Sequence, residues 1–221
     1  VEYGTATSYG LWTIDSTNVT AHSVTLNDLA FGKTYHYRVL SRDSAGESAS
    51  ADATFATAAL PANATTTSVS SSKQLLLDGH PFFPIMQWLQ CPALFATNVS
   101  LGVNTFMGNG CDSSTSDQSY LDQLRSNNAV GILPYDGAVK SHPALAGWNG
   151  LDEPDTKPNY PSDLQAEFDS NRANDPAHAN FLTLSPNFFS QLSPPSWMNG
   201  NRSYYSQYAA TADMPGFDIY P

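Results

Sequence analysis

The sequence predicts a multidomain chain: a truncated all-β sandwich at the amino end, followed by an α/β domain of the TIM-type, (β/α)8-barrel class. Residues 1–57 contain short alternating strand patterns separated by Gly and Asn/Asp turns, without a helical period. From residue 73 to 221, apolar strand-like runs alternate with helix-like stretches, which is typical of a parallel sheet with helices outside it. Residues 58–72 are small and polar, so we expect a linker there, with an ordered strand as the alternative.

The composition indicates a globular protein with few surface charges. The chain has 221 residues, of which 41% are hydrophobic and 13% charged, and its net charge is −11. This acidic balance argues against nucleic acid and anionic membranes as partners, because both attract basic patches. There is no long apolar run and no basic leader, so we expect neither membrane insertion nor a retained signal peptide. The chain opens and closes in strand-like sequence, which we interpret as a fragment of a longer protein.

The first domain is justified by three alternating segments, residues 22–26, 34–40 and 51–57. In the second of these, Tyr35, Tyr37 and Val39 share one face, which we expect to be core. The stretch 29–39, with its Gly32-Lys33 turn followed by Tyr35, resembles a fibronectin type III domain. The resemblance implies an immunoglobulin-like sandwich with Tyr35 at the tyrosine corner. It covers only the later strands, and the first two are missing.

The second domain is justified by six strand-like runs and four helical stretches. We expect strands at 82–88, 103–107, 130–135, 145–151, 181–184 and 217–220, and helices at 92–101, 117–127, 162–174 and 203–212. Six such units correspond to six eighths of a barrel that normally needs about 250 residues. An open doubly wound sheet is the competing architecture, but no Gly-rich nucleotide loop supports it.

The fourth strand carries the strongest chemical signal. Its apolar, glycine-spaced run ends in Asp152-Glu153-Pro154, and the proline marks the strand exit. Barrel enzymes keep their chemistry at the carboxyl ends of the strands. Glu153 is therefore the candidate catalytic acid, with Asp152 beside it. The alternative is that Glu153 only caps a following turn.

The other strand ends offer amides and aromatic rings, a mixture that suits sugar hydroxyls and sugar ring faces. The predicted substrate-binding residues are Gln87, Trp88, Asn109, Tyr135, Trp148, Asn149 and Tyr220. Trp88 and Trp148 fit a core position equally well. The five histidines show no metal-ligand spacing, so we expect no metal and no cofactor.

Three segments together resemble the clan A glycoside hydrolases: residues 73–85 with their Asp78-Gly79-His80-Pro81 turn, residues 142–154, and the ending 218–221. The resemblance implies a carbohydrate substrate, an oligo- or polysaccharide, and Glu153 as general acid/base. It also implies a nucleophile on a seventh strand, beyond residue 221. Asp136 and Asp218 are the in-chain alternatives for a second carboxylate. The family usually has Asn before the catalytic Glu, whereas this chain has Asp152, whose charge would raise the pKa of Glu153.

Two functions therefore stay open. The first is a secreted, carbohydrate-active hydrolase. The second is a catalytically inactive extracellular module that binds glycans or builds a structural assembly such as a filament. Both place the protein outside the cell or at its surface, as do the few Lys residues and the abundant Ser, Thr and Asn.

Two kinds of modification are expected. Cys91 and Cys111 follow the ends of neighbouring strands, so we expect a disulfide at the rim, with free buried thiols as the alternative. Four sequons offer weak candidates for glycosylation, at Asn18, Asn63, Asn98 and Asn201.

Overall fold

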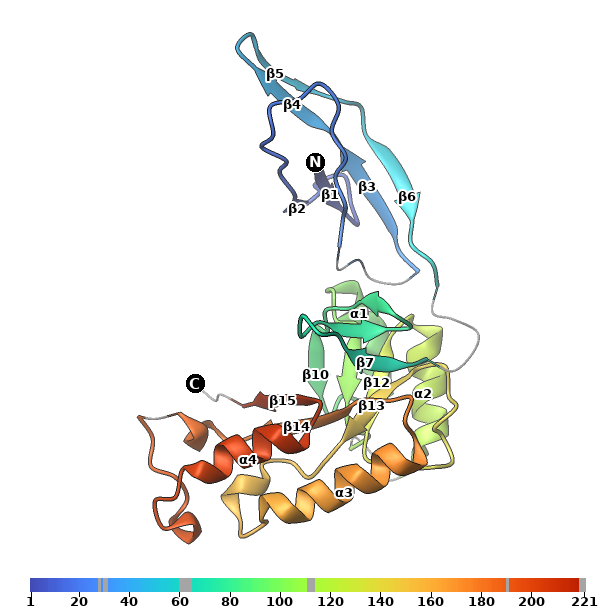
Figure 1. Cartoon of the computed structure of the whole chain (residues 1–221). Coiled ribbons are helices and arrows are strands. Elements are labelled where there is room, and N and C mark those ends of the chain that lie inside the picture. The colour runs from blue at the N-terminus through green and yellow to red at the C-terminus, as the bar shows by residue number, and fades with distance from the viewer. Residues whose placement is uncertain (28, 30–31, 60–64, 111–113, 190, 219–221) are drawn as a thin grey trace. The chain divides into compact units, whose positions relative to one another are not determined.

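The computed structural model describes residues 1–27, 29, 32–59, 65–110, 114–189 and 191–218. The chain forms two compact units, Val1–Leu60 and Pro61–Pro221 (Figure 1). Part of the expected linker, residues 67–69, is strand β7 of the second unit, in line with the ordered-strand alternative. No helix that the structure describes has the length and apolar character that crossing a membrane requires.

The first unit is built on one antiparallel sheet in the order β2-β1-β3-β6. Its strands are β1 (Glu2–Gly4), β2 (Leu11–Trp12), β3 (Thr34–Arg38) and β6 (Ala53–Ala56), and a separate hairpin joins β4 (Leu40–Asp43) to β5 (Gly46–Ala49). Tyr35 is buried and stacks on Phe55 with 5.6 Å between ring centroids, and Tyr3 lies 6.5 Å from Tyr35. Tyr35 therefore faces a core, whereas Val39 is 46% exposed.

The expected strand at 22–26 has no strand partner among the described residues. Alternation predicted it, but a strand needs a neighbour to satisfy its backbone N–H and C=O groups. The described strands form one layer and a hairpin, so the second layer of a sandwich stays a prediction.

The second unit contains an open sheet of six parallel strands in sequence order, β10 to β15. These are β10 (Met86–Trp88), β11 (Thr105–Met107), β12 (Val130–Leu133), β13 (Leu145–Asn149), β14 (Asn180–Leu184) and β15 (Met214–Phe217). A small antiparallel sheet precedes them, formed by β7 (Thr67–Val69), β8 (Leu75–Leu77) and β9 (His80–Pro81). The α/β arrangement confirms the predicted parallel sheet; closure into a barrel is not seen among the described strands.

Helices alternate with the strands close to the predicted ranges. They are η1 (Pro92–Leu94), α1 (Phe95–Ser100), α2 (Asp117–Ser126), η2 (Pro154–Thr156), α3 (Pro161–Asn174), η3 (Pro186–Phe188), η4 (Ser196–Met198) and α4 (Ser203–Thr211). Ser116 caps α2 by accepting the amide of Ser119 at 3.2 Å. Pro161 opens α3, where its missing N–H costs nothing.

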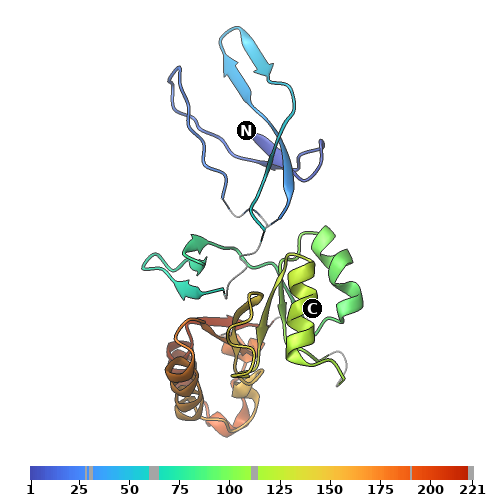
Figure 2. The same ribbon diagram turned by 90° about the vertical axis from the view of Figure 1, so that its right-hand side faces the viewer.

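The helices cover one face of the parallel sheet. Phe106, Leu133 and Trp148 form one core with the buried side chains of α1 and α2. These two helices lie side by side in Figure 2. Leu182 and Leu184 of β14 join those of α3 and α4 in a second core. Burying these side chains fixes the sheet and thereby the positions of its strand ends.

Candidate functional site

The small β7–β9 sheet lies at the amino ends of the parallel strands. Thr67 of β7 donates its amide to Ala177 O at 2.8 Å, and its Oγ1 accepts the Ala179 amide at 2.7 Å, just before β14. The Thr65 hydroxyl donates to the carbonyl of Leu145, the first residue of β13. The β7–β9 sheet thus contacts the amino ends of β13 and β14, whereas Glu153 lies at the opposite, carboxyl end of β13.

Glu153 is held at the carboxyl end of β13 by the neighbouring strand. After Gly150, whose amide donates to Phe181 O at 3.0 Å, the chain bulges at residues 151 and 152. It returns at Glu153, whose amide donates to Thr183 O at 3.1 Å. The Glu153 carbonyl accepts the Thr156 amide at 3.1 Å and the Thr156 hydroxyl at 2.8 Å.

The backbone of Glu153 is left-handed, with φ 41° and ψ 55°. This conformation costs a non-glycine residue about 1–2 kcal/mol. In a regular strand, the adjacent residues Asp152 and Glu153 would point to opposite faces of the sheet. The bulge and the left-handed turn remove the strict alternation of a strand and with it that restriction.

Burial and neighbouring acids raise the pKa of two carboxyl groups at this end, Glu153 and Asp152. Burial raises the pKa of the Glu153 carboxyl, and the charges of Asp152, Asp218 and Asp155 raise it further. Burial and then the charge of Asp218 raise the pKa of Asp152. Asp218 follows β15, where its amide donates to Leu184 O at 2.9 Å. The carboxyl groups after β13 and β15 thus interact across the end of β14.

All three predicted amides, Gln87, Asn109 and Asn149, present a buried side-chain oxygen without a hydrogen-bond partner among the described residues. Asn109 donates to Thr115 O at 2.8 Å and to Asp117 Oδ1 at 2.9 Å, and Asn149 donates to Gly150 O at 3.2 Å. In both asparagines that oxygen is Oδ1. Such an oxygen can accept a hydroxyl of a ligand.

Gln87 lies on the face of the parallel sheet that the helices cover. It pairs in register with Phe106, which belongs to the helix-covered core. Residues in register on neighbouring strands share a face. The position of Gln87 therefore does not fit the predicted contact with substrate.

Trp148 is a core residue, which corrects its predicted role as a sugar platform. Its side chain is fully buried, and its Nε1 donates to Asp175 Oδ2 at 2.9 Å. The ring of Tyr135 packs 4.9 Å away. Tyr135 and Trp88 are 36% and 40% exposed and keep ring surface for a ligand. Tyr220 lies outside the described residues.

The predicted modifications have different surroundings. Asn18 and Asn201 are exposed, Asn63 lies outside the described residues, and Asn98 is buried in α1 with an unpartnered Nδ2. A glycan at Asn98 does not fit this burial. Cys91 precedes η1, and Cys111 lies outside the described residues, so their disulfide stays a prediction.

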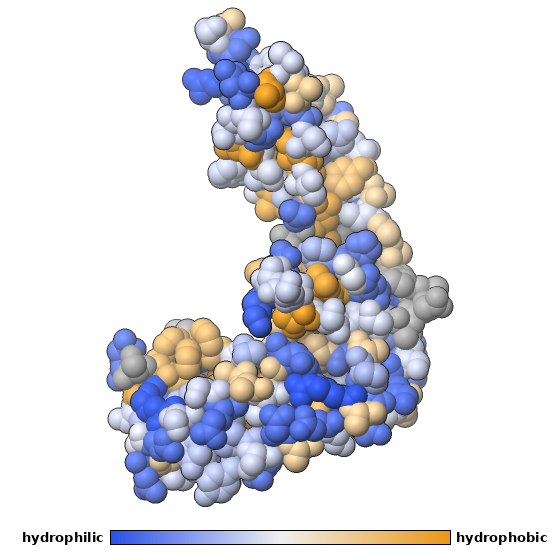
Figure 3. All heavy atoms as spheres, viewed as in Figure 1, coloured by the Kyte–Doolittle hydropathy of each residue, from blue (hydrophilic) through white to orange (hydrophobic). Residues whose placement is uncertain are grey.

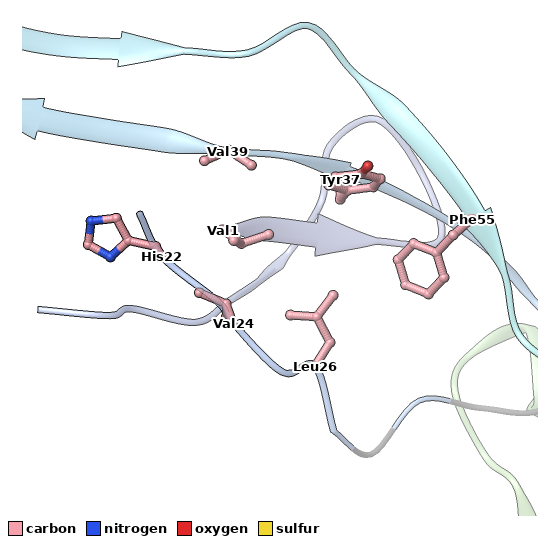
Figure 4. Close-up of a pocket in the computed structure, with 7 residues that line it drawn as sticks. All are labelled: Val1, His22, Val24, Leu26, Tyr37, Val39 and Phe55. Carbon is pink, nitrogen blue, oxygen red and sulfur yellow. The ribbon is translucent and has the colours of Figure 1, made fainter. Parts of the chain in front are cut away.

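Among the described residues, the acids after β13 are part of neither a metal cluster nor the cavity that opens in the first unit. The described residues contain no group of three His, Cys, Asp or Glu side chains suited to a metal. A cavity of about 350 Å³ opens in the first unit instead, lined mainly by apolar side chains that include Val24, Leu26 and Phe55 (Figure 4). It belongs to a different unit from the acids and holds none of them.

Comparisons with known proteins give only distant likenesses. No protein-family model and no curated protein matches the sequence. A glycosyl hydrolase family 2 member from Bacteroides cellulosilyticus has a TM-score of 0.49 at 9% identity, over 85% of this chain and 27% of that one. A family 2 β-galacturonidase from Eisenbergiella tayi, bound to galacturonate, has a TM-score of 0.48 at 11% identity, over 86% and 35%. A Parabacteroides merdae β-glucuronidase has 0.45 at 10%, over 89% and 26%. The chain spans about a quarter to a third of these proteins, and at these values the likeness assigns it neither a family nor an activity.

The sequence predicted no role for Asp155, and it offered Asp218 only as an alternative for the second carboxylate. Asp155 is completely buried and bonded to Ser185, thirty positions along the chain. A local pattern does not reveal such a partner. For Asp218 the sequence did hold a signal, because the residue lies in the strand predicted at 217–220. In the structure Asp218 directly follows β15, which is the neighbour of β14 in the sheet.

Proposed function

We propose that the intact protein is a secreted glycoside hydrolase in which Glu153 is the general acid/base, acting on an oligo- or polysaccharide. The raised pKa of Glu153, caused by burial and three neighbouring acids, is the observation that carries the proposal. A carboxyl group that retains its proton closer to neutral pH can protonate the oxygen of a leaving group. Glycoside hydrolysis requires that step.

The second carboxylate has two possible sources. In a (β/α)8 barrel begun by β10 to β15, a seventh strand beyond residue 221 would supply it. The chain itself offers Asp136 and Asp218, of which Asp218 is favoured, because its charge and not that of Asp136 acts on Asp152 and Glu153. Carboxyl groups roughly 5 Å apart belong to retaining enzymes, and about 6.5–9.5 Å to inverting ones.

The remaining parts of the proposal follow from the strand ends. Trp88 and Tyr135 offer partly exposed rings for stacking on a sugar, and Asn109 and Asn149 offer buried acceptors for its hydroxyls. The first unit is proposed to be a fibronectin type III-like module that accompanies the hydrolase unit.

Hydrolysis of aryl glycosides by the intact protein and its Glu153→Gln variant tests the proposal. We expect the variant to lose more activity as the leaving phenol becomes more basic, because a good leaving group needs no protonation. Glu167→Gln is the matched control, since Glu167 lies on α3 and its pKa is also raised by burial. Unchanged turnover of Glu153→Gln contradicts the role of Glu153. Sugar binding without hydrolysis by the wild type favours the inactive glycan-binding module instead.

A further inference from the structure

Asp155, two residues after Glu153, is a fully buried carboxylate with several donors. Its Oδ1 accepts the Ser185 amide at 2.9 Å, and its Oδ2 accepts the Ser185 hydroxyl at 2.5 Å and the Tyr205 hydroxyl at 3.5 Å. Its backbone carbonyl accepts Trp197 Nε1 at 2.8 Å. Burial and then the charge of Asp155 raise the pKa of Tyr205 to about 12. A buried carboxylate stays in place when hydrogen bonds of this kind compensate its desolvation.

These bonds continue the contact between the chain after β13 and strand β14. The amide of Gly150 bonds to Phe181 O, and the amide of Glu153 bonds to Thr183 O. The Asp155 carboxylate then accepts the amide of Ser185. The three contacts use alternate residues of β14 and its continuation, 181, 183 and 185. At the first two contacts the β14 side accepts through a backbone carbonyl. At the third the direction is reversed, since the Ser185 amide donates and a side-chain oxygen of Asp155 accepts.

Glu153 itself makes the second of these contacts, and the third follows two residues downstream at Asp155. A non-glycine residue in the left-handed region is strained, and such strain persists only where the surroundings over-determine the conformation. The upstream restraint is the Glu153 amide itself. Two restraints lie downstream: the Thr156 amide and hydroxyl, which bond to the Glu153 carbonyl, and Asp155, which the buried Pro154 joins to Glu153.

We infer that Asp155 is a positioning residue: held by Ser185 and Tyr205, it fixes the backbone of Glu153 and so places the Glu153 carboxyl beside Asp152 and Asp218. Its importance for catalysis rests on the proposed function. The positioning itself is measurable without a substrate.

Amide hydrogen exchange in the full chain tests the positioning. In Asp155→Asn we expect the Glu153 amide to exchange at least about tenfold faster, while the Gly150 amide, one contact upstream, changes much less. Asp175→Asn is the matched control, because Asp175 is also buried and accepts Trp148 Nε1, His178 Nδ1 and the Ala177 amide near the other end of β14. The control should leave the ratio of the two exchange rates unchanged.

An unchanged ratio in Asp155→Asn overturns the inference. If that variant does not fold, Ser185→Ala removes one donor and keeps the carboxylate. The ratio should then shift less, in the same direction, and no shift again overturns the inference.

Kinetics of the intact protein separate this inference from the proposed function. Asp155→Asn should lower kcat about tenfold with KM within about twofold. It should also move the alkaline limb of the pH–rate profile to lower pH, because a charge that raises the pKa of Glu153 is lost. Lower activity with an unchanged pH profile and an unchanged exchange ratio overturns the positioning role. If the wild type hydrolyses no glycoside, the proposed function fails, and the exchange ratio still decides the role of Asp155.

Discussion

Glu153 combines two features that are unfavourable by themselves: a left-handed backbone and a carboxyl group near three other acids. Both are sustained by bonds to β14 and to Thr156. Strain and like charges that are retained together at a strand end are typical of functional sites.

The backbone strain can be measured by replacing the side chain. We expect Glu153→Gly to be more stable than Glu153→Ala by roughly 0.5–1 kcal/mol, because Ala pays the left-handed penalty and Gly does not. Urea unfolding of the two variants measures this difference. An Ala variant as stable as the Gly variant would show that residue 153 is not strained.

The repulsion among the acids should appear in the pH dependence of stability. Asp152 and Glu153 have folded-state pKa values above their ordinary ones, so the native state binds their protons more tightly than the unfolded state does. Their ionisation therefore destabilises the fold increasingly as pH rises through the raised pKa values, and the penalty vanishes at low pH. Asp218→Asn removes one repelling charge, so its Tm relative to wild type should be more favourable at pH 7 than at pH 3. A Tm difference that is independent of pH would contradict this coupling.

At the scale of elements, the close contact between β13 and β14 requires a glycine. A Cβ on Gly147 would lie 2.6 Å from Phe181 Cε2 and 2.8 Å from the backbone oxygen of Ala179. The backbone oxygen cannot move aside, so the two strands would have to separate.

We expect Gly147→Ala to lower the free energy of unfolding of the second unit by about 1–3 kcal/mol, the usual cost of overpacking. Gly216→Ala in β15 is the control, because its Cβ would approach no atom closer than Leu182 O at 3.7 Å. Denaturant unfolding of both variants makes the comparison. Equal effects would mean that the space around Gly147 does not limit the sheet.

A helix or strand could be predicted from the sequence where the residues that determine it are close to it in the chain. The limits of α2 and α3 follow from Ser116 and Pro161, which act within one helical turn. The strand expected at 22–26 was wrong, because pairing depends on a neighbour that its own alternation does not supply. For the candidate site, the exit at Pro154 predicted that Glu153 follows the end of the fourth parallel strand, as it does in the structure. The burial of Trp148 depends instead on Asp175 and Tyr135, which local sequence does not reveal.

At the scale of the whole molecule, the chain consists of two units with separate cores. On the face drawn in Figure 3, hydrophilic and apolar residues are interspersed over both units. Exposed apolar residues also occur at or just after the carboxyl ends of parallel strands, among them Leu89, Leu151 and Phe217. Composition predicted the acidic, globular character, but the division of the core follows from contacts between distant residues.

Separate cores should unfold separately. We expect Tyr35→Ala to destabilise the first unit by about 3–5 kcal/mol, as for other buried aromatic residues cut to Ala. The second unit should be unaffected, because Tyr35 packs on Tyr3 and Phe55 of its own unit. Calorimetry should show one transition lowered and the other unchanged. A single transition that shifts as a whole would show that the units fold cooperatively.

The most direct measurement is an NMR titration of the Glu153 carboxyl carbon in the full chain, assigned with Glu153→Gln. We expect a pKa above the ordinary value for Glu, which moves down in Asp218→Asn, because burial and neighbouring charges raise the pKa of this group. An ordinary pKa that does not respond to Asp218 would contradict the role of Glu153 as a proton donor at the end of β13.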